Sequence, residues 1–393
     1  MSAAGADREA RLLLSIAGEP GDPRLTGLVE QVGAVETVEF LQARGRQGQL
    51  GAALAERIAS ARPERTMELA TKRGLRFVTP ADDEWPDQLA DLAEVPTLHE
   101  RGGVPVGLWL RGPLRLNEAV RGSVAVVGAR SATTYGAGVA GRIASELVAG
   151  EVPVVSGAAF GIDQAAHRGA LAARGVTVAV LACGADRVYP TAHQALLDYI
   201  AEVGLVASEA PPGGAPTRIR FLARNRLIAA LATGTVVVEA AVRSGALNTA
   251  NWADSLSRTL MGVPGPVVSA ASHGVHLLIR NRNALLVTGG ADVLEAVQPV
   301  GRHGIARQVG GQTRPRDGLP QLEREVLDAV PLRRGAGVDR IARVAGVPPE
   351  IVAKTLPRLH EAGFVERAGD RWRLVAPDAV AAPAEEEGGE FVP

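Results

Sequence analysis

The sequence predicts an α/β protein: a doubly wound, Rossmann-like parallel sheet, preceded by a small helical domain and followed by a winged helix. Two observations predict the sheet. Short apolar runs recur between residues 124 and 265, and most of them end in Gly, Ser or Glu. Ala-rich stretches with helical periodicity separate these runs. Apolar strands that alternate with helices are typical of a parallel sheet covered on both faces.

Residues 1–73 are predicted to form the helical domain. Apolar side chains recur at helical spacing on both sides of Gly33, and they are Leu28, Val29, Val32, Val35, Val38 and Leu41. The segment GLVEQVGAVETVEFL is similar to a helix-hairpin-helix (SAM-like) unit. A plain packing module is the alternative that we favour for this region.

The sheet domain is predicted over residues 74–299. Its strands are expected at VAVVG (124–128), VPVVSG (152–157), VTVAVLACG (176–184), GLVASE (204–209), TVVVEA (235–240) and TLMGVPG (259–265). Ligands of such sheets bind in the crevice beyond the carboxyl ends of the strands. The residues that follow the strands are therefore the candidates for a binding site.

Three further segments complete the predicted organisation. Residues 300–319 are rich in Gly, Arg and Pro and are predicted to be a linker. Residues 320–376 give three short amphipathic helices and a hairpin, which is the layout of a winged helix. Residues 377–393 are rich in Ala, Pro and Glu and are predicted to be a disordered acidic tail.

The predicted recognition helix of the winged helix has mixed charge. It carries Glu350 and Glu361 beside Lys354 and Arg358. Carboxylates repel the phosphates of DNA, so such a helix should bind duplex DNA poorly. We expect this domain to make protein contacts or weak auxiliary DNA contacts.

The overall composition excludes several classes of protein. The chain has 42 basic and 43 acidic side chains, so it does not hold nucleic acid over its whole surface, although a local patch remains compatible with this balance. The single cysteine, Cys183, excludes a disulfide framework and a cysteine-based zinc site. No signal peptide or membrane segment is evident, and we expect a cytoplasmic protein.

The first candidate site is GARSATTYG, which follows the strand at 124–128. Gly128 permits a tight turn, and the backbone N–H groups that follow favour an anion. Arg130 stands where a dinucleotide-binding G-x-G-x-x-G motif has its second glycine, so the pattern favours a phosphate over NAD, and no cofactor is expected. A simple tight turn without a ligand is an equal alternative for this segment alone.

The second candidate site is SGAAFGIDQAAHRGAL. Ser156 and Gly157 end a strand, and Asp163 and His167 lie four residues apart on one face of the helix that follows. These two side chains could form an acid–base dyad. We favour a structural role, in which Asp163 stabilises the helix N-terminus, because neither a nucleophile nor a metal-ligand set is evident nearby.

The third candidate site, TRIRFLARNR, is the most informative one. Four arginines surround an aromatic residue, and these residues are Arg218, Arg220, Phe221, Arg224 and Arg226. No acidic residue occurs between Glu209 and Glu239. The planar guanidinium suits phosphate, and an aromatic ring can stack on a base. We therefore favour nucleic-acid or nucleotide binding over a solvated charged face.

A fourth segment, VVVEAAVRSGALNTA, offers another anion-facing turn. Arg243, Ser244 and Gly245 lie between a strand and a helix. Glu239 ends the strand, and its simplest role is to hold a nearby arginine in place.

These motifs, in this order along residues 74–297, resemble the DNA-processing protein A (DprA/Smf) family. The resemblance implies an extended Rossmann fold and a positively charged pocket for single-stranded DNA. It further implies a homodimer formed through the Rossmann domain. The family's role is to protect incoming single strands and to load the RecA recombinase onto them in natural transformation and recombination. No catalytic activity, metal or cofactor is implied.

The resemblance also assigns residues to the pocket. Gly128 and Arg130 match the family's G-x-R turn, and Ser156 and Gly157 match its S-G turn. The F-x-x-R-N-R region is matched by Arg218, Phe221, Arg224, Asn225 and Arg226. The resemblance does not assign the remaining candidates, which the segments themselves offer for supporting roles: Asp163, His167, Glu239, Arg243, Ser244 and Gly245.

Two alternatives to this function stay open at the level of the sequence. The chain could be a Rossmann nucleotide hydrolase resembling the lysine-decarboxylase-like phosphoribohydrolases, with Glu239 as the acid or base. Those enzymes carry a P-G-G-x-G-T motif that VVVEAAVRSGALNTA lacks. The chain could also be an interaction scaffold whose sheet has lost its ligand.

Overall fold

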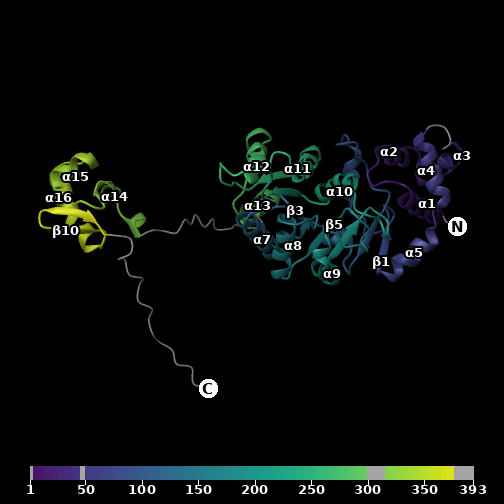
Figure 1. Cartoon of the computed structure of the whole chain (residues 1–393), viewed down its shortest axis with the longest axis horizontal. Helices are drawn as coiled ribbons and strands as arrows, with labels where there is room; N and C mark the ends of the chain where they lie inside the picture. Colours follow the sequence, from purple (N-terminus) through teal and green to yellow (C-terminus); the bar gives the residue numbers. More distant parts are fainter. Residues whose placement is uncertain (1–2, 45–48, 299–314, 376–393) are drawn as a thin grey trace, which may run out of the picture. The chain divides into compact units, whose positions relative to one another are not determined.

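The computed structural model describes residues 3–44, 49–298 and 315–375, and the chain divides into two compact units, residues 1–305 and 306–393 (Figure 1). Most of the predicted linker and the whole of the predicted acidic tail lie outside the described residues. In the described part of the chain, no helix has the length and apolar character that a membrane-spanning segment needs.

The first unit begins with five helices. They are α1 (Ala3–Ala17), α2 (Pro23–Val32), α3 (Ala34–Arg44), α4 (Gln49–Ser60) and α5 (Pro63–Lys72). Asp22 begins α2 by accepting a hydrogen bond from the N–H of Arg24, and Gly33, with φ +90°, separates α2 from α3. Leu25, Val29 and Val38 pack into one small core with α1. The helical periodicity around Gly33 thus corresponds to two helices of one bundle.

A nine-stranded sheet forms the body of the first unit, in the order β1-β2-β6-β5-β4-β3-β7-β8-β9. Its strands are β1 (Leu75–Val78), β2 (Leu108–Arg111), β3 (Val124–Val127), β4 (Val154–Ser156), β5 (Thr177–Leu181), β6 (Leu205–Ser208), β7 (Gly234–Val237), β8 (Thr259–Gly262) and β9 (Leu285–Leu286). Strands β3 to β8 fall on the six predicted runs and pair in parallel. Strands β1 and β2 pair antiparallel and extend the sheet beside β6. The sheet is therefore parallel apart from this extension.

Helices cover both faces of the sheet. One face carries α7 (Thr134–Ala149), α8 (Ile162–Ala172), α9 (Gln194–Val203) and α13 (Gly290–Val297), and the other carries α10 (Arg218–Ala230), α11 (Ala246–Ser255) and α12 (Ala270–Asn281). Alternate residues of β3 show this division, since Val124 and Val126 face α7 whereas Ala125 and Val127 face α10. The fold is the doubly wound sheet that the sequence predicts.

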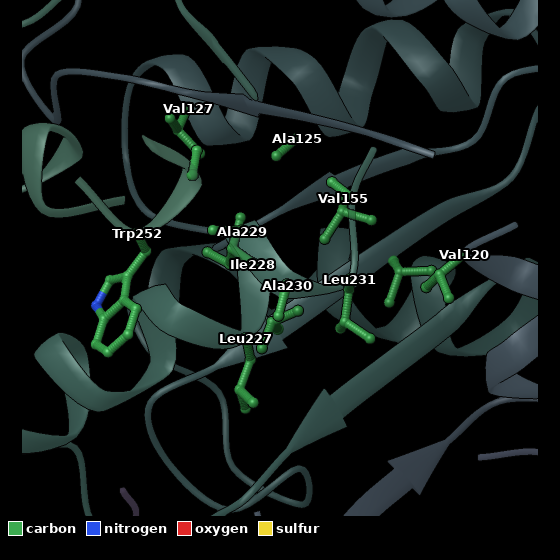
Figure 2. Packing of buried hydrophobic residues seen from close by; sticks show 14 of the residues in the cluster. Val120, Ala125, Val127, Val155, Leu227, Ile228, Ala229, Ala230, Leu231 and Trp252 are labelled. Carbon is green, nitrogen blue, oxygen red and sulfur yellow. The ribbon is translucent and has the colours of Figure 1, made fainter. Parts of the chain in front are cut away.

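The end of α10 lies deep in the core (Figure 2). Leu227, Ile228 and Leu231 are almost fully buried with Trp252 of α11 and Val155 of β4. Two short segments also contribute to this cluster, namely the 3-10 helix η1 (Asp87–Ala93) and α6 (Leu116–Ala119). The arginine-rich first half of α10 is therefore held by an anchored second half.

The second unit has its own core. Its described elements are the 3-10 helix η3 (Pro315–Gly318), α14 (Gln321–Asp328), α15 (Val338–Ala345), α16 (Pro349–Glu361), β10 (Val365–Ala368) and β11 (Arg371–Leu374). Strands β10 and β11 form an antiparallel hairpin, and Ala336 bridges to Trp372 beside it. Ile341, Val352 and Leu356 are buried against Trp372. Three helices followed by a hairpin is the element order of a winged helix.

Candidate nucleic-acid interface

A cavity of about 690 Å³ opens where β3 and β7 lie side by side. The chain leaves β3 toward β4 on one side and leaves β7 toward β8 on the other, so this is the point at which the strand order reverses. The crevice at such a point is the usual ligand site of a doubly wound sheet. Loops after β3 and β7 and the start of α10 line the cavity.

The turn after β3 is tightly packed. A side chain at Gly128 would lie 2.5 Å from Ile162 and 2.8 Å from the carbonyl oxygen of Glu239, so only glycine fits there. Arg130 follows at the cavity rim with an exposed side chain. The predicted roles of a tight turn at Gly128 and a protruding Arg130 match this geometry.

Glu239 holds this turn in place through hydrogen bonds to Thr133. Its carboxylate accepts hydrogen bonds from the N–H of Thr133, at 2.9 Å, and from the Thr133 hydroxyl, at 2.5 Å. The side chain is 2% exposed and does not line the cavity. The prediction that Glu239 holds an arginine is wrong, because its partner is Thr133 of the neighbouring turn.

The first half of α10 forms one wall of the cavity. Thr217 begins the helix by accepting from the N–H of Arg220 at 3.3 Å. The residues of α10 that reach the cavity recur every three or four positions, and they are Arg218, Phe221, Leu222, Arg224, Asn225 and Ile228. This spacing places them on one helix face.

An aromatic ring lies at the centre of the wall. The Arg130 guanidinium carbon is 4.6 Å from the centre of the Phe221 ring, and that of Arg224 is 5.8 Å from it. Tyr189, in the loop after β5, lies 5.6 Å from Phe221, ring centre to ring centre, and also lines the cavity. Tyr189 was missed in the sequence, although an exposed aromatic residue after a strand is a usable signal.

Arg224 forms the floor. It donates to the carbonyl oxygens of Gly157 (2.5 Å) and Val180 (2.6 Å), and only 6% of it is exposed. Burial lowers the pKa of Arg224 and the Arg130 charge lowers it further, while Asp163 raises it. A side chain at Gly157 would overlap the Arg224 guanidinium. Ser156 is buried and donates to the Val126 carbonyl, so Ser156 and Gly157 shape the floor and do not line the cavity.

Asp163 and His167 do not form a dyad. Asp163 lines the cavity and is buried, which raises its pKa, although Arg224 and backbone N–H groups act in the opposite direction. His167 points away, its Nδ1 lying 2.7 Å from the Thr177 hydroxyl oxygen. Burial lowers the pKa of His167 to about 3. The structural role that we favoured for this pair agrees with these contacts.

The turn after β7 closes the far side of the cavity, and Arg243, Ser244 and Gly245 all line it. Asn225 connects this turn to α10, since its amide donates to the side-chain oxygen of Asn248 at 3.2 Å and to the Gly245 carbonyl at 3.4 Å. Four predicted segments therefore meet at one cavity.

The prediction that Arg226 belongs to the pocket is wrong, because Arg226 does not line the cavity. Its guanidinium is fully buried and donates to both carboxylate oxygens of Glu209, at 2.7 and 2.8 Å. It also donates to the Gly103 carbonyl, and Glu209 in turn accepts from the N–H of Gly21. Arg226 thus has a structural role, and a ligand could contact its guanidinium only if these hydrogen bonds were broken.

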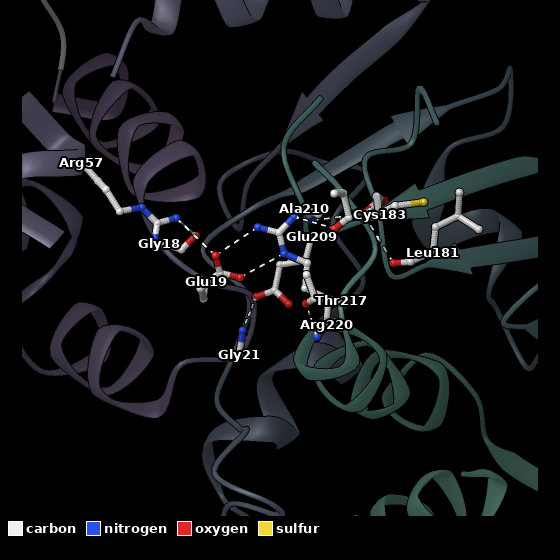
Figure 3. A network of polar contacts seen from close by, with 12 residues as sticks. Gly18, Glu19, Gly21, Arg57, Leu181, Cys183, Glu209, Ala210, Thr217 and Arg220 are labelled. Carbon is white, nitrogen blue, oxygen red and sulfur yellow. Dashed lines mark hydrogen bonds and ion pairs between the residues drawn. The ribbon is translucent and has the colours of Figure 1, made fainter. Parts of the chain in front are cut away.

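Arg220 also faces away from the cavity. It donates to Glu19 at 3.0 and 3.1 Å, and Glu19 pairs with Arg57 as well (Figure 3). The loop after α1 therefore holds the first half of α10 directly, through Glu19 and Arg220. It reaches the second half through Gly21 and Glu209, the partner of Arg226. Hydrogen bonds and charge from Arg220 and Arg57 lower the pKa of Glu19 against the effect of its burial. The helical front of the chain thus positions the cavity wall.

The cavity is electropositive. Arg130, Arg218 and Arg243 are exposed at its rim, and none of them forms an ion pair with a described residue. Among the described residues that line the cavity, Asp163 alone carries a carboxylate. No group of three or more His, Cys, Asp or Glu side chains in the described residues could hold a metal ion. The arrangement suits a ligand with several phosphates and a flat ring.

Comparisons with known proteins point in one direction. Residues 76–298 match the model of the family described as DNA recombination-mediator protein A. The chain is 44% identical to the DprA relative of Mycobacterium tuberculosis, over 96% of this chain and 97% of the relative. It is 34% identical to the Smf protein of Escherichia coli, over 73% of this chain and 74% of that protein. The structure of DprA from Streptococcus pneumoniae is similar, with a TM-score of 0.62 and 31% identity over 75% of this chain and 98% of that one.

Proposed function

This chain belongs to the DNA recombination-mediator protein A (DprA/Smf) family, and we propose that it binds single-stranded DNA in the cavity between β3, β7 and α10. The bound strand is protected there and is delivered to the RecA recombinase during DNA uptake and recombination. In this proposal the cavity residues that contact DNA are Arg130, Arg218, Phe221 and Arg224, with Arg243 at the opposite rim.

One observation carries the proposal. Three exposed arginines, none paired with a carboxylate of a described residue, line the same cavity as Phe221, and the Arg130 guanidinium lies 4.6 Å from the centre of the Phe221 ring. The arginines match the repeating phosphates of a polynucleotide, and the ring matches the face of a base. In a duplex both faces of each base are stacked inside the helix, so this combination favours a single strand. Because phosphates and ring faces are common to all sequences, binding should be salt-dependent and largely sequence-tolerant.

The experiment that tests this proposal replaces side chains of the cavity wall by alanine and measures the affinity for single-stranded DNA. We expect Arg218→Ala with Phe221→Ala to weaken binding of an oligothymidylate by at least tenfold, since one stacked base contributes about 1–3 kcal/mol. Arg130→Ala should weaken binding and lower the salt slope by about 0.7 for the lost phosphate contact. Arg65→Ala, an exposed arginine of α5, is the control. Unchanged affinity of both cavity variants in a gel-shift assay would show that DNA binds elsewhere.

The same proposal makes the protein a binding protein without catalysis. The carboxylate that a phosphoribohydrolase would use, Glu239, is engaged by Thr133 and lies outside the cavity lining. Turnover of a nucleoside monophosphate by the wild-type chain, lost in Glu239→Gln, would contradict this part of the proposal.

We also propose that the chain forms a homodimer through the sheet domain. Among the described residues, no strand covers the outer side of β9, and its Leu285 and Leu286 are about half exposed. An uncovered apolar edge strand favours pairing with another chain. We expect Leu286→Glu to shift the sedimenting species from dimer to monomer, whereas Val203→Glu, a similarly exposed site on α9, should not. A wild-type monomer at all concentrations would contradict the dimer.

A further inference from the structure

A second groove, of about 840 Å³, adjoins the cavity on the side of α7 and α8. The two share Arg130 and Ser131, which line both. They also meet at the loop after β4, where Ala159 lines the cavity and the next residue, Phe160, lines the groove. A polymer that leaves the cavity past Arg130 would therefore enter this groove without a break.

The charge of the groove matches that of the cavity. Arg130 and Arg168 are its charged residues, and no carboxylate occurs among the described residues that line it. Arg168 is exposed on α8 and has no ion pair or hydrogen bond from its side chain to another described residue. The groove thus offers a second unpaired guanidinium beyond Arg130.

An aromatic ring is fixed at the entrance. Phe160 is 46% exposed, a high value for a phenylalanine beside a cavity. Its ring lies edge-on to the ring of His193, with centres 4.7 Å apart and planes at 71°. His193 is itself buried and donates from Nδ1 to the Ala158 carbonyl, at 3.0 Å. Phe160 is therefore a half-exposed ring that His193 supports, and an exposed aromatic ring offers a stacking surface to an unpaired base.

We propose that this groove is a second subsite for single-stranded DNA, which takes the nucleotides that follow those in the cavity. Phe160 stacks on a base, Arg168 contacts a phosphate, and Arg130 lies at the junction between the two subsites. This inference rests on the proposed function. It extends the bound strand in one direction, across the side of the sheet covered by α7 and α8.

Continuity and charge favour DNA as the occupant over a protein. Small residues such as Ala137, Gly141 and Ala165 line the groove, and they would also admit a helix from a partner protein. A protein helix, however, would leave Arg168 and Arg130 without phosphates and would need carboxylates of its own. A strand that already occupies the cavity supplies phosphates at the junction.

The test measures affinity for a ladder of oligothymidylates, from one that fills only the cavity to progressively longer ones. We expect Phe160→Ala to leave the shortest oligonucleotide unaffected and to weaken the long ones about tenfold. Arg168→Ala should lower the salt slope by about 0.7 for long oligonucleotides alone. Phe160→Trp should retain the affinity for long strands, because it retains the ring. The matched control is Phe40→Ala, which removes an equally exposed ring from α3.

The outcomes separate this inference from the proposed function. If Phe160→Ala and Arg168→Ala bind every oligothymidylate with the affinity of the wild type, the second subsite is overturned. In that case, weaker binding of the shortest oligothymidylate by Arg218→Ala with Phe221→Ala would still support the cavity as a DNA site. If these two groove variants bind every oligonucleotide normally and only fail to support RecA assembly, the groove is a protein site and the proposal is wrong. Thermal unfolding of each variant checks that the fold is retained.

Discussion

At the scale of single residues, two arginines of α10 illustrate how burial decides the role of a charge. Arg224 is buried without a paired carboxylate and keeps its guanidinium at the floor of the cavity, donating to two carbonyl oxygens. Arg226, two positions further, is neutralised by Glu209 inside the protein. A buried ion pair is costly to break, because removal of one partner leaves an uncompensated charge away from water.

Removal of Glu209 should therefore destabilise the fold strongly. We expect Glu209→Ala to lower the free energy of unfolding by about 3–5 kcal/mol, the usual cost of an uncompensated buried charge. Glu202→Ala, at an exposed position of α9, should change it by less than about 0.5 kcal/mol. Urea unfolding followed by circular dichroism measures both. Equal stability of the two variants would mean that Arg226 finds another partner or water.

At the scale of secondary-structure elements, the contact between α7 and α8 positions residues that line both the cavity and the adjoining groove. Gly169 of α8 lies against the backbone of Gly141 of α7, and a side chain at Gly169 would overlap the Gly141 carbonyl oxygen. The close approach holds α8, with Asp163 and Arg168, against the turn that carries Arg130. Backbone contact of this kind leaves no side chain that could rearrange to relieve a clash.

Gly169→Ala should therefore be destabilising even though alanine favours helices. We expect a loss of about 1–3 kcal/mol from overpacking. Gly138→Ala is the control: Gly138 lies in α7 with nothing within 4 Å of the added carbon, so we expect a gain of about 0.5–1 kcal/mol from helix propensity. Thermal unfolding compares the two. A gain in both variants would show that the helices can separate without cost.

Elements were predictable from the sequence where a single pattern determined them. The six apolar runs predicted β3 to β8, because strands buried on both faces are apolar throughout. Strands β1 and β2 contain Arg76 and Arg111, which form ion pairs with Glu84 and Asp198, so the apolar pattern is interrupted and both were missed.

The residues that line the cavity could be predicted where local sequence determines them, and their binding role stays a prediction. Gly128, Arg130 and Phe221 were found because a turn after a strand and an acid-free stretch are local features. The role of Arg226 could not be predicted from local sequence. Tertiary packing determines both its partner Glu209 and which face of α10 turns toward the front helices. The contact between Glu239 and Thr133 was missed for the same reason.

At the scale of the whole molecule, near-neutral net charge and a positive cavity are compatible. Glu19 and Glu209 form ion pairs with Arg220 and Arg226 on the side of α10 that faces the front helices. The arginines at the cavity rim have no such partners in the part of the chain that the structure describes. Net charge averages over both regions, whereas a polyanion responds to the local field.

The proposed DNA cavity lies wholly within the first compact unit, and this gives a prediction about the second. A chain ending at residue 305 should bind oligothymidylate with the affinity of the full chain. The isolated second unit should bind duplex DNA weakly, because Glu350 and Glu361 accompany Lys354 and Arg358 on the surface of α16. Both affinities can be measured by fluorescence anisotropy. Strong, salt-sensitive duplex binding by the second unit would contradict the expected role of its helix α16.

The place of β7 in the sheet has a consequence for biosynthesis. Its neighbour β3 is made first, and β4, β5 and β6 follow on the opposite side, so one edge of β3 stays open until Gly234–Val237 leaves the ribosome. The nascent chain therefore carries an apolar edge through much of its synthesis, where chaperones or another nascent chain could pair with it. The same order keeps the cavity incomplete until its last wall is translated, so prematurely terminated fragments would lack the complete cavity that we propose for DNA.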